Sequence, residues 1–200
     1  ANQYVGNWPG VTVEKKEGKL KNQKDVTVTD LPGIYSLSPY TLEEVVSRDY
    51  LLKEKPDVII DLVDATNIER NLYLATQLLE IGIPVVIALN MVDLLKKNNI
   101  HINVKGLSSA LGCPIVETSA LKGTGLKEVV DEAIKCANQH RVPSKQMEFP
   151  KAVEKAVNEI EGLVPVNISE ENRRWYAVKL LERDSKVKEG LNLPASAQSR

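Results

Sequence analysis

The chain has 200 residues, of which 42% are hydrophobic and 26% are charged, and its formal net charge is -1. This balance is ordinary for a globular domain and argues against a general affinity for nucleic acid or an anionic membrane, and no apolar run approaches the ~18 residues of a membrane-spanning helix. The two cysteines, Cys113 and Cys136, have no CxxC partner and no zinc-ligand spacing, which favours two free thiols.

Strands and helices are predicted to alternate along most of the chain. Thr41 followed by Glu44 forms a capping box that marks the start of a helix, and the run DVIIDLVD at 57–64 is typical of a strand buried on both faces. The helix predicted at 126–137 has an inner face made of Leu126, Val129, Val130 and Ala133. The predicted elements are a hairpin of residues 11–20 and 24–30, helices at 41–53, 67–81, 104–111 and 126–137, and strands at 57–64, 84–89 and 114–118.

This alternation predicts βαβ units and therefore an α/β fold in which helices flank a mainly parallel sheet. The pattern changes after Arg141, because residues 142–144 are typical of a linker and only helices, at 150–163 and 170–182, are predicted beyond them. We therefore predict two domains. An α/β domain covers 1–141, and a small, incomplete helical subdomain covers 142–200 and ends in a frayed polar tail.

Loops that follow the predicted strands carry the candidate site, because ligands of open α/β sheets bind at the carboxyl edge of the strands. The first such loop is Asp30-Leu31-Pro32-Gly33. Its aspartate can hold Mg²⁺ through water beside a triphosphate, and its glycine can offer a backbone N–H to a terminal phosphate. A plain turn is the alternative, since these residue types also favour turns.

The second loop, Asn90-Met91-Val92-Asp93, follows the strand at 84–89. A carboxylate at this place can accept hydrogen bonds from N1–H and the N2 amine of guanine, whereas adenine presents the opposite donor pattern, so the pairing is specific. Asn90 can brace neighbouring loops and meet the purine N7. The alternative is a helix start at which Asp93 is only the cap.

The third loop, Thr118-Ser119-Ala120-Leu121, follows the strand at 114–118. Its small residues allow the backbone N–H of Ala120 to approach the guanine O6. The alternative is a turn stabilised by the Ser and Thr hydroxyl groups. By itself this signal has little specificity.

The fourth loop, Gly6-Asn7-Trp8-Pro9-Gly10-Val11-Thr12, precedes the predicted hairpin. A loop rich in Gly and Pro that ends in Thr is typical of a mobile segment that closes over a nucleotide. Thr12 can give its hydroxyl to Mg²⁺ and its N–H to the γ-phosphate, while Gly10 and Val11 lead into it. Alternatively, Trp8 is simply a buried aromatic side chain.

The four loops occur in the order that a guanine-nucleotide-binding domain requires, and together they predict that function. The phosphate-binding pattern G-x-x-x-x-G-K-[ST] is not found, and Gly18-Lys19-Leu20 is the nearest string. The order of the other motifs places that loop upstream of Ala1. We therefore expect this chain to lack the first strand and the phosphate-binding loop, and to bind GTP poorly by itself.

The segments GNWPGVTVEKKEG, TDLPGIYSLSPYTLEEVVSRDYLL, DATNIERNLYLATQLLE and ALNMVDLL resemble the cytosolic N-terminal domain of bacterial ferrous iron transport protein B. The resemblance runs from residue 1 to about 140. The helical segment that follows also fits this family, in which a small helical domain stands between the G domain and a polytopic membrane domain.

The resemblance implies a GTPase attached to an Fe²⁺ transporter at the cytoplasmic face of the bacterial cell membrane, with the membrane domain as its partner. It leaves open a homo-oligomer of the full-length protein. It implies GTP or GDP, Mg²⁺ and K⁺ as ligands. The implied catalytic residues are Thr12 and Gly33, and the two switch segments also contain Gly10, Val11, Asp30, Leu31 and Pro32. The residues implied around the guanine are Asn90, Met91, Asp93, Ser119, Ala120 and Leu121. Thr12 and Asp30 are implied at Mg²⁺, and backbone of Gly6 and Trp8 is implied at K⁺.

Two positions depart from the pattern of many GTPases. The second residue of the guanine motif is Met91 instead of lysine, so it can pack on the purine without contributing a cation. Ile34 follows Gly33, where Ras-like proteins have a glutamine that orients the attacking water, and slow turnover is therefore expected. A nucleotide-responsive docking module with little hydrolysis is the alternative function, while a dinucleotide enzyme is disfavoured because G-x-G-x-x-G is absent.

Overall fold

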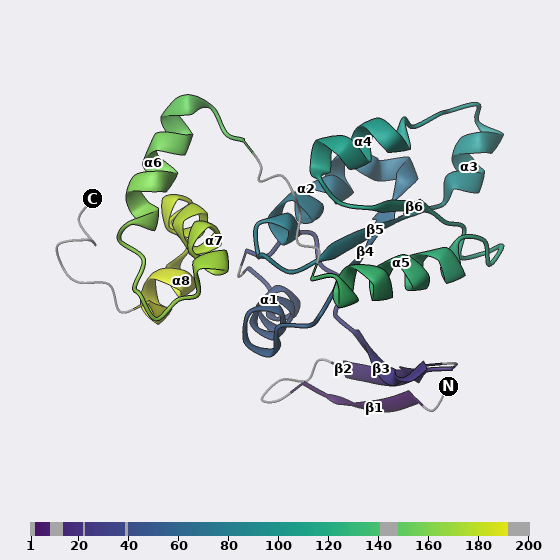
Figure 1. The fold of residues 1–200 in the computed structure, drawn as a ribbon, viewed down its shortest axis with the longest axis horizontal. Coiled ribbons are helices and arrows are strands. Elements are labelled where there is room, and N and C mark those ends of the chain that lie inside the picture. The colour runs from purple at the N-terminus through teal and green to yellow at the C-terminus, as the bar shows by residue number, and fades with distance from the viewer. Residues whose placement is uncertain (1–2, 9–13, 22, 39, 141–147, 192–200) are drawn as a thin grey trace. The chain divides into compact units, whose positions relative to one another are not determined.

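The structure is a computed structural model that describes residues 3–8, 14–21, 23–38, 40–140 and 148–191 (Figure 1). The chain forms two compact units, residues 1–55 and residues 56–200. The domain boundary predicted at 141/142 lies beside residues 141–147, which are outside the described part, and it stays a prediction.

The first unit contains an antiparallel sheet with the strand order β1-β2-β3. Strand β2 (Glu14–Leu20) and strand β3 (Gln23–Asp30) form the predicted hairpin, with an irregularity in register between Lys19 and Leu20. Strand β1 (Gln3–Asn7) pairs with β2 and was not predicted, because its first part lies before the hairpin and its last part, Gly6 and Asn7, was assigned to a loop. Its residues pair with residues of β2 that lie seven to fifteen positions further along the chain, so local periodicity does not reveal the strand.

Helix α1 (Leu42–Glu54) completes the first unit and begins where the capping box predicted. The Thr41 hydroxyl accepts a hydrogen bond from Glu44 N–H at 3.2 Å, and the Glu44 carboxylate accepts one from Thr41 N–H at 3.1 Å. These two bonds satisfy amide groups that the first helical turn leaves without partners. The helix ends at Lys55, which adopts a left-handed conformation (φ 46°).

The second unit contains a parallel sheet with the strand order β4-β5-β6, made of β4 (Ile59–Asp64), β5 (Val85–Asn90) and β6 (Ile115–Glu117). A short 3-10 turn (Ala65–Asn67) leads from β4 into helix α2 (Ile68–Leu79). Helix α3 (Val92–Lys97) and helix α4 (Val104–Leu111) connect β5 to β6, and helix α5 (Leu126–Asn138) follows β6. The α/β fold with a mainly parallel sheet is thus confirmed.

Helix α5 covers one face of the parallel sheet, and α2 and α4 cover the other (Figure 1). On the α5 side, Val86 packs with Ala133 and Cys136. Two predictions about burial are wrong on this side. The strand β4 is not buried on both faces, since Ile60 and Leu62 are 38% and 70% exposed, and Leu126 is also exposed. Strand β4 lies at the edge of the parallel sheet, where α5 leaves Ile60 and Leu62 uncovered. Leu126 is exposed because it is the first residue of α5.

The C-terminal segment folds into helices α6 (Lys151–Glu161), α7 (Glu170–Leu181) and α8 (Ser185–Gly190). The first two were predicted, and their buried contact consists of Val157, Val164 and Ala177. Helix α8 was not predicted because it is only six residues long and begins at Asp184, whose carboxylate accepts a hydrogen bond from Val187 N–H at 3.0 Å.

Both cysteines are free, as predicted, and both are buried. Burial raises the pKa of the Cys113 thiol to about 12, so this thiol stays protonated at neutral pH. In the part of the chain that the structure describes, no helix is both long enough and apolar enough to cross a bilayer.

Candidate nucleotide-binding site

The carboxyl ends of β5 and β6 bring the second and third predicted loops together. Asn90 is the last residue of β5, and its side-chain oxygen accepts a hydrogen bond from the backbone N–H of Ala120 at 3.0 Å. The Thr118 hydroxyl donates to the same oxygen at 3.4 Å. One amide side chain therefore fixes the loop that follows the neighbouring strand, as the rule for ligand sites in parallel sheets leads us to expect.

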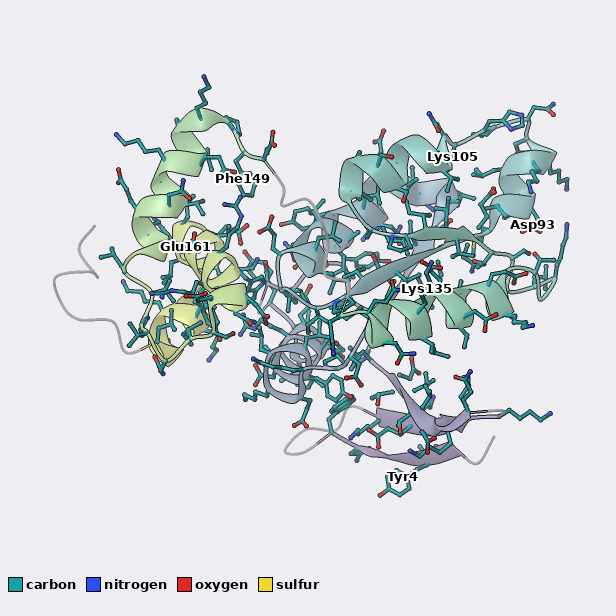
Figure 2. The ribbon with its side chains drawn as sticks, viewed as in Figure 1. Tyr4, Asp93, Lys105, Lys135, Phe149 and Glu161 are labelled. Carbon is teal, nitrogen blue, oxygen red and sulfur yellow. The ribbon has the colours of Figure 1, made fainter. Side chains whose placement is uncertain are left out.

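Asp93 stands in the first turn of α3 (Figure 2). The residue that caps this helix is Met91, which adopts a left-handed conformation (φ 65°, ψ 23°) and makes no side-chain capping bond. The alternative in which Asp93 is the cap is therefore wrong. Its carboxylate interacts with the backbone N–H of Asp93 itself, and the Met91 side chain, two positions earlier, is 40% exposed.

The loop after β6 is a tight turn over residues 119–125. Ser119 and Thr124 exchange two backbone hydrogen bonds, at 3.1 and 3.2 Å, and Lys122 N–H donates to the Ser119 carbonyl at 3.1 Å. Gly123 and Gly125 have positive φ angles of 68° and 76°, which L residues with a side chain rarely adopt. This turn holds the Ala120 N–H in place and leaves the Leu121 side chain 92% exposed.

Two neighbours stabilise the ionised form of Asp93. The pKa of its carboxyl lies below the ordinary value, first through the Ser119 side chain, next through the backbone N–H of Asp93 itself, and then through Lys122, whose Nζ is 3.6 Å from Asp93 Oδ2. The buried Ser119 hydroxyl has no partner of good hydrogen-bond geometry among the described residues, so it acts on Asp93 by proximity. The ionised carboxylate only accepts hydrogen bonds, as a guanine partner must.

Lys122 was missed when the sequence was interpreted. The available signal was a lysine two residues after Ala120, in a protein whose guanine motif lacks its usual lysine. That signal is weak, because a lysine in an exposed turn is common. The distance to Asp93 becomes apparent only when the turn is folded.

The predicted phosphate and metal residues belong to the other compact unit. Asp30 is the last residue of β3 and is exposed. Gly33 is also exposed, and a Cβ added to it would meet no atom within 4 Å. The Ser47 hydroxyl of α1 donates to the Pro32 carbonyl at 3.4 Å and so ties this segment to the helix. Leu31 is half-buried.

The loop at 6–12 is only partly described. Gly10, Val11 and Thr12 lie outside the described residues, and Gly6 belongs to β1. Trp8 is 6% exposed, and its ring makes an edge contact with the Tyr50 ring, with 5.1 Å between the centroids. Lys15 Nζ lies 5.0 Å from the centroid of the Trp8 ring. Trp8 is therefore a buried aromatic side chain, and the role proposed for its backbone at K⁺ is separate from this burial.

The described residues contain no group of three or more His, Cys, Asp and Glu side chains that could hold a metal ion. A Mg²⁺ ion beside a nucleotide takes only one or two protein oxygens and several from water and phosphate. The exposed Asp30 carboxylate, at the end of β3, can supply one of these protein oxygens.

A parallel sheet that carries polar loops at its carboxyl edge, followed by a helical region, defines an α/β domain of the G-domain type. Residues 1–133 match the family model for ferrous iron transport protein B, and residues 149–200 match the model for the FeoB cytosolic helical domain. The chain therefore belongs to the ferrous iron transport protein B family and corresponds to its N-terminal cytosolic part.

Individual relatives agree with this assignment. The chain is 42% identical over 192 residues to the Fe(2+) transporter FeoB of Shigella flexneri and 41% identical to that of Escherichia coli (strain K12). These alignments cover 92% of the chain but only 24% of each relative.

Two solved structures of S. thermophilus NFeoB are also similar. A mutant bound to GDP superimposes with a TM-score of 0.91 at 48% identity, covering 99% of this chain and 76% of that one. The mGMPPNP-bound protein gives a TM-score of 0.87 at 48% identity, covering 100% and 75%. Both resemble this chain in fold and in sequence.

Proposed function

We propose that this chain is the GTP-binding and GTP-hydrolysing regulatory domain of a ferrous iron membrane transporter, placed at the cytoplasmic face of the bacterial cell membrane. The observation that carries the proposal is the hydrogen bond from Ala120 N–H to Asn90 Oδ1, with the ionised Asp93 carboxylate on the adjoining helix. The similar S. thermophilus proteins that were solved with GDP or mGMPPNP support the nucleotide class.

The hydrogen-bonding groups at the carboxyl ends of β5 and β6 suit the donors and acceptors of guanine. The two oxygens of Asp93 would accept from N1–H and from the N2 amine of guanine. The Ala120 N–H, which donates to Asn90 Oδ1 in this structure, would have to share its hydrogen with O6 or turn toward it when guanine binds. Asn90 braces the two loops against each other. The exposed apolar side chains of Met91 and Leu121 are available to cover the purine faces.

The residues proposed to contact the phosphates belong to residues 1–55. Asp30 and the Thr12 hydroxyl would hold Mg²⁺, which neutralises charge on the β- and γ-phosphates when it is bound. The exposed backbone of Gly33, where no side chain interferes, would donate its N–H to the γ-phosphate. Thr12 would also donate its own N–H to the γ-phosphate. Since Ile34 cannot orient water, we expect backbone groups to do so and hydrolysis to be slow.

The proposal includes K⁺ as an activator, held in part by backbone of Gly6 and Trp8. Strand β1 is the edge strand of its sheet, so part of its backbone is not used in pairing with β2. Carbonyl oxygens of such an edge are ligands that suit K⁺. Rates of GTP hydrolysis in KCl and in NaCl, measured on the full-length natural protein, test this part of the proposal.

The base assignment is tested with Asp93→Asn. Xanthine has a carbonyl where guanine has its amine, so an amide suits xanthine better than a carboxylate does. We expect the variant of the full-length protein to lose affinity for GDP and gain affinity for XDP in calorimetric titrations. Unchanged preference for GDP over XDP would show that Asp93 does not read the base.

A second candidate function is a nucleotide-responsive docking module whose hydrolysis is incidental. The observation that favours it is Ile34 at the position after Gly33. Single-turnover hydrolysis separates the two functions. A rate that K⁺ raises well above that of free GTP supports the GTPase, while nucleotide binding without measurable hydrolysis supports the docking module.

A further inference from the structure

A cation close to the guanine acceptor comes from an unexpected part of the chain. The second position of the guanine motif is the neutral Met91, but Lys122 reaches Asp93 from the turn after β6, with 3.6 Å between Nζ and Oδ2. The Asp93 side chain is only 16% exposed, so its carboxylate is partly screened from water, whereas the Lys122 side chain is 61% exposed.

The turn places Lys122 by backbone bonds that do not depend on a ligand. Lys122 N–H donates to the Ser119 carbonyl at 3.1 Å, and Gly123 N–H donates to the Ala120 carbonyl at 3.3 Å. The same turn presents Ala120 N–H to Asn90. The lysine and the predicted O6 donor are therefore carried by one element and are expected to keep a constant spacing.

We propose that Lys122 is a specificity-determining positioning residue of the guanine site, where it orients the Asp93 carboxylate in place of the lysine that the guanine motif lacks. This inference rests on the proposed function. An ionised carboxylate has about four acceptor positions on its two oxygens. Guanine would use one position on each oxygen, which leaves a position on Oδ2 for the lysine, so the two partners bind together without competing.

Competition is the opposite arrangement, in which the lysine must leave before guanine binds. The two arrangements predict changes of opposite sign when the lysine is removed. If Lys122 supports Asp93, its loss weakens guanine binding, and if it competes, its loss strengthens guanine binding. The sign of the change is thus the primary result of the test.

The experiment measures dissociation constants of GDP and IDP for the full-length natural protein by titration calorimetry. IDP lacks the N2 amine, so it uses Asp93 through one hydrogen bond instead of two. We expect Lys122→Ala to weaken GDP about two- to fivefold, the range of a partly exposed ion pair, and to weaken IDP less. Lys122→Arg should restore most of the GDP affinity, and Lys127→Ala, an exposed lysine of α5, should leave it unchanged.

A double-mutant cycle with Asp93→Asn tests the mechanism, because a positioning residue has no effect once its target is neutral. In that background, Lys122→Ala should change GDP affinity by less than a factor of about 1.5. An equal loss in both backgrounds, or tighter GDP binding in the single variant, would overturn the inference. An unmutated protein that does not prefer GDP to ADP would refute the proposed function itself, whereas a clear preference that is insensitive to Lys122→Ala refutes only the inference.

Discussion

Arg174 Nε donates a hydrogen bond to Glu80 Oε2 at 3.0 Å, across 94 positions of sequence. The same guanidinium makes two further bonds to the carboxylate of Glu154, at 2.9 and 3.1 Å. The side chains of Arg174 and Glu80 are only 8% and 7% exposed. One buried arginine of α7 thus binds the end of α2 and helix α6 together, and the planar guanidinium is suited to such forked contacts.

We therefore predict that Arg174→Met lowers the free energy of unfolding by about 3 to 5 kcal/mol, because it removes the charge partner of a buried carboxylate. Urea unfolding followed by circular dichroism at 222 nm measures this loss. Arg183→Met is the matched control, since Arg183 is exposed, and it should change the stability by less than about 0.5 kcal/mol. Equal small losses in both variants would contradict the prediction.

Asp61 is a buried carboxyl group in β4 and gives a pH-dependent prediction. It is 7% exposed, its Oδ2 has no hydrogen-bond partner among the described residues, and burial raises its pKa to about 6. The folded state therefore holds this proton more tightly than the unfolded state does. Its contribution is most favourable below the unfolded pKa near 4, and stability is lost as the pH rises from there through 6.

We predict that Asp61→Asn stabilises the protein at pH 8 by about 2 to 3 kcal/mol and by much less at pH 4, because an amide has no charge to bury. Urea midpoints at these two pH values measure the difference. Asp57→Asn, at an exposed position just before the same strand, should show no such dependence. A gain from Asp61→Asn that is the same at both pH values would mean that ionisation is not its cause.

Apart from the six-residue helix α3, which was not predicted, the order of strands and helices from β4 to α5 could be predicted because each element shows its buried face as a local period. The local period does not show which segment packs on that face. Ile60 and Leu62 look like core residues in sequence, but what packs on them depends on distant segments and on β4 being an edge strand. Strand β1 and helix α8 are too short for their own periodicity to identify them.

The guanine half of the candidate site could also be assembled from sequence, since parallel strands bring their carboxyl ends to one edge. That rule anticipates the contact of Asn90 with Ala120. The rule does not predict the place of Lys122, which depends on the geometry of the turn at 119–125, nor the contact of Arg174 with Glu80, which depends on tertiary packing. The roles of Thr12, Asp30 and Gly33 at the phosphates stay predictions.

The buried Trp8 provides a prediction for the first unit. Its ring meets the edge of Tyr50, whose hydroxyl donates to the Thr29 hydroxyl at 3.2 Å. We expect Tyr50→Leu to remove about 0.5 to 1.5 kcal/mol of stability and to expose the indole. With 5-fluorotryptophan incorporated, the ¹⁹F resonance of Trp8 should move toward its unfolded position, while that of Trp175, buried in α7, serves as an internal control and stays in place. Tyr73→Leu, at an exposed tyrosine, should move neither resonance.

Gly125 and Gly123 allow a matched test of the turn after β6. Both have a positive φ, so alanine strains the backbone at either position. At Gly123 an added Cβ meets nothing within 4 Å, whereas at Gly125 it would clash with the Glu117 carbonyl oxygen and lie 3.0 Å from Thr118 Cγ2. Because of this clash, either the end of β6 or the turn that carries Ala120 must shift.

We therefore predict that Gly125→Ala lowers the affinity of the full-length protein for GDP by roughly tenfold more than Gly123→Ala does, which corresponds to about 1.4 kcal/mol. Calorimetric titration with GDP measures the difference, and thermal unfolding checks that both variants are folded at the temperature used. Similar affinities in the two variants would indicate that the turn binds guanine without being positioned from β6. A loss in Gly125→Ala that also abolishes binding of the phosphate end, tested with pyrophosphate, would indicate general unfolding, because the displacement of Ala120 affects only contacts with the base.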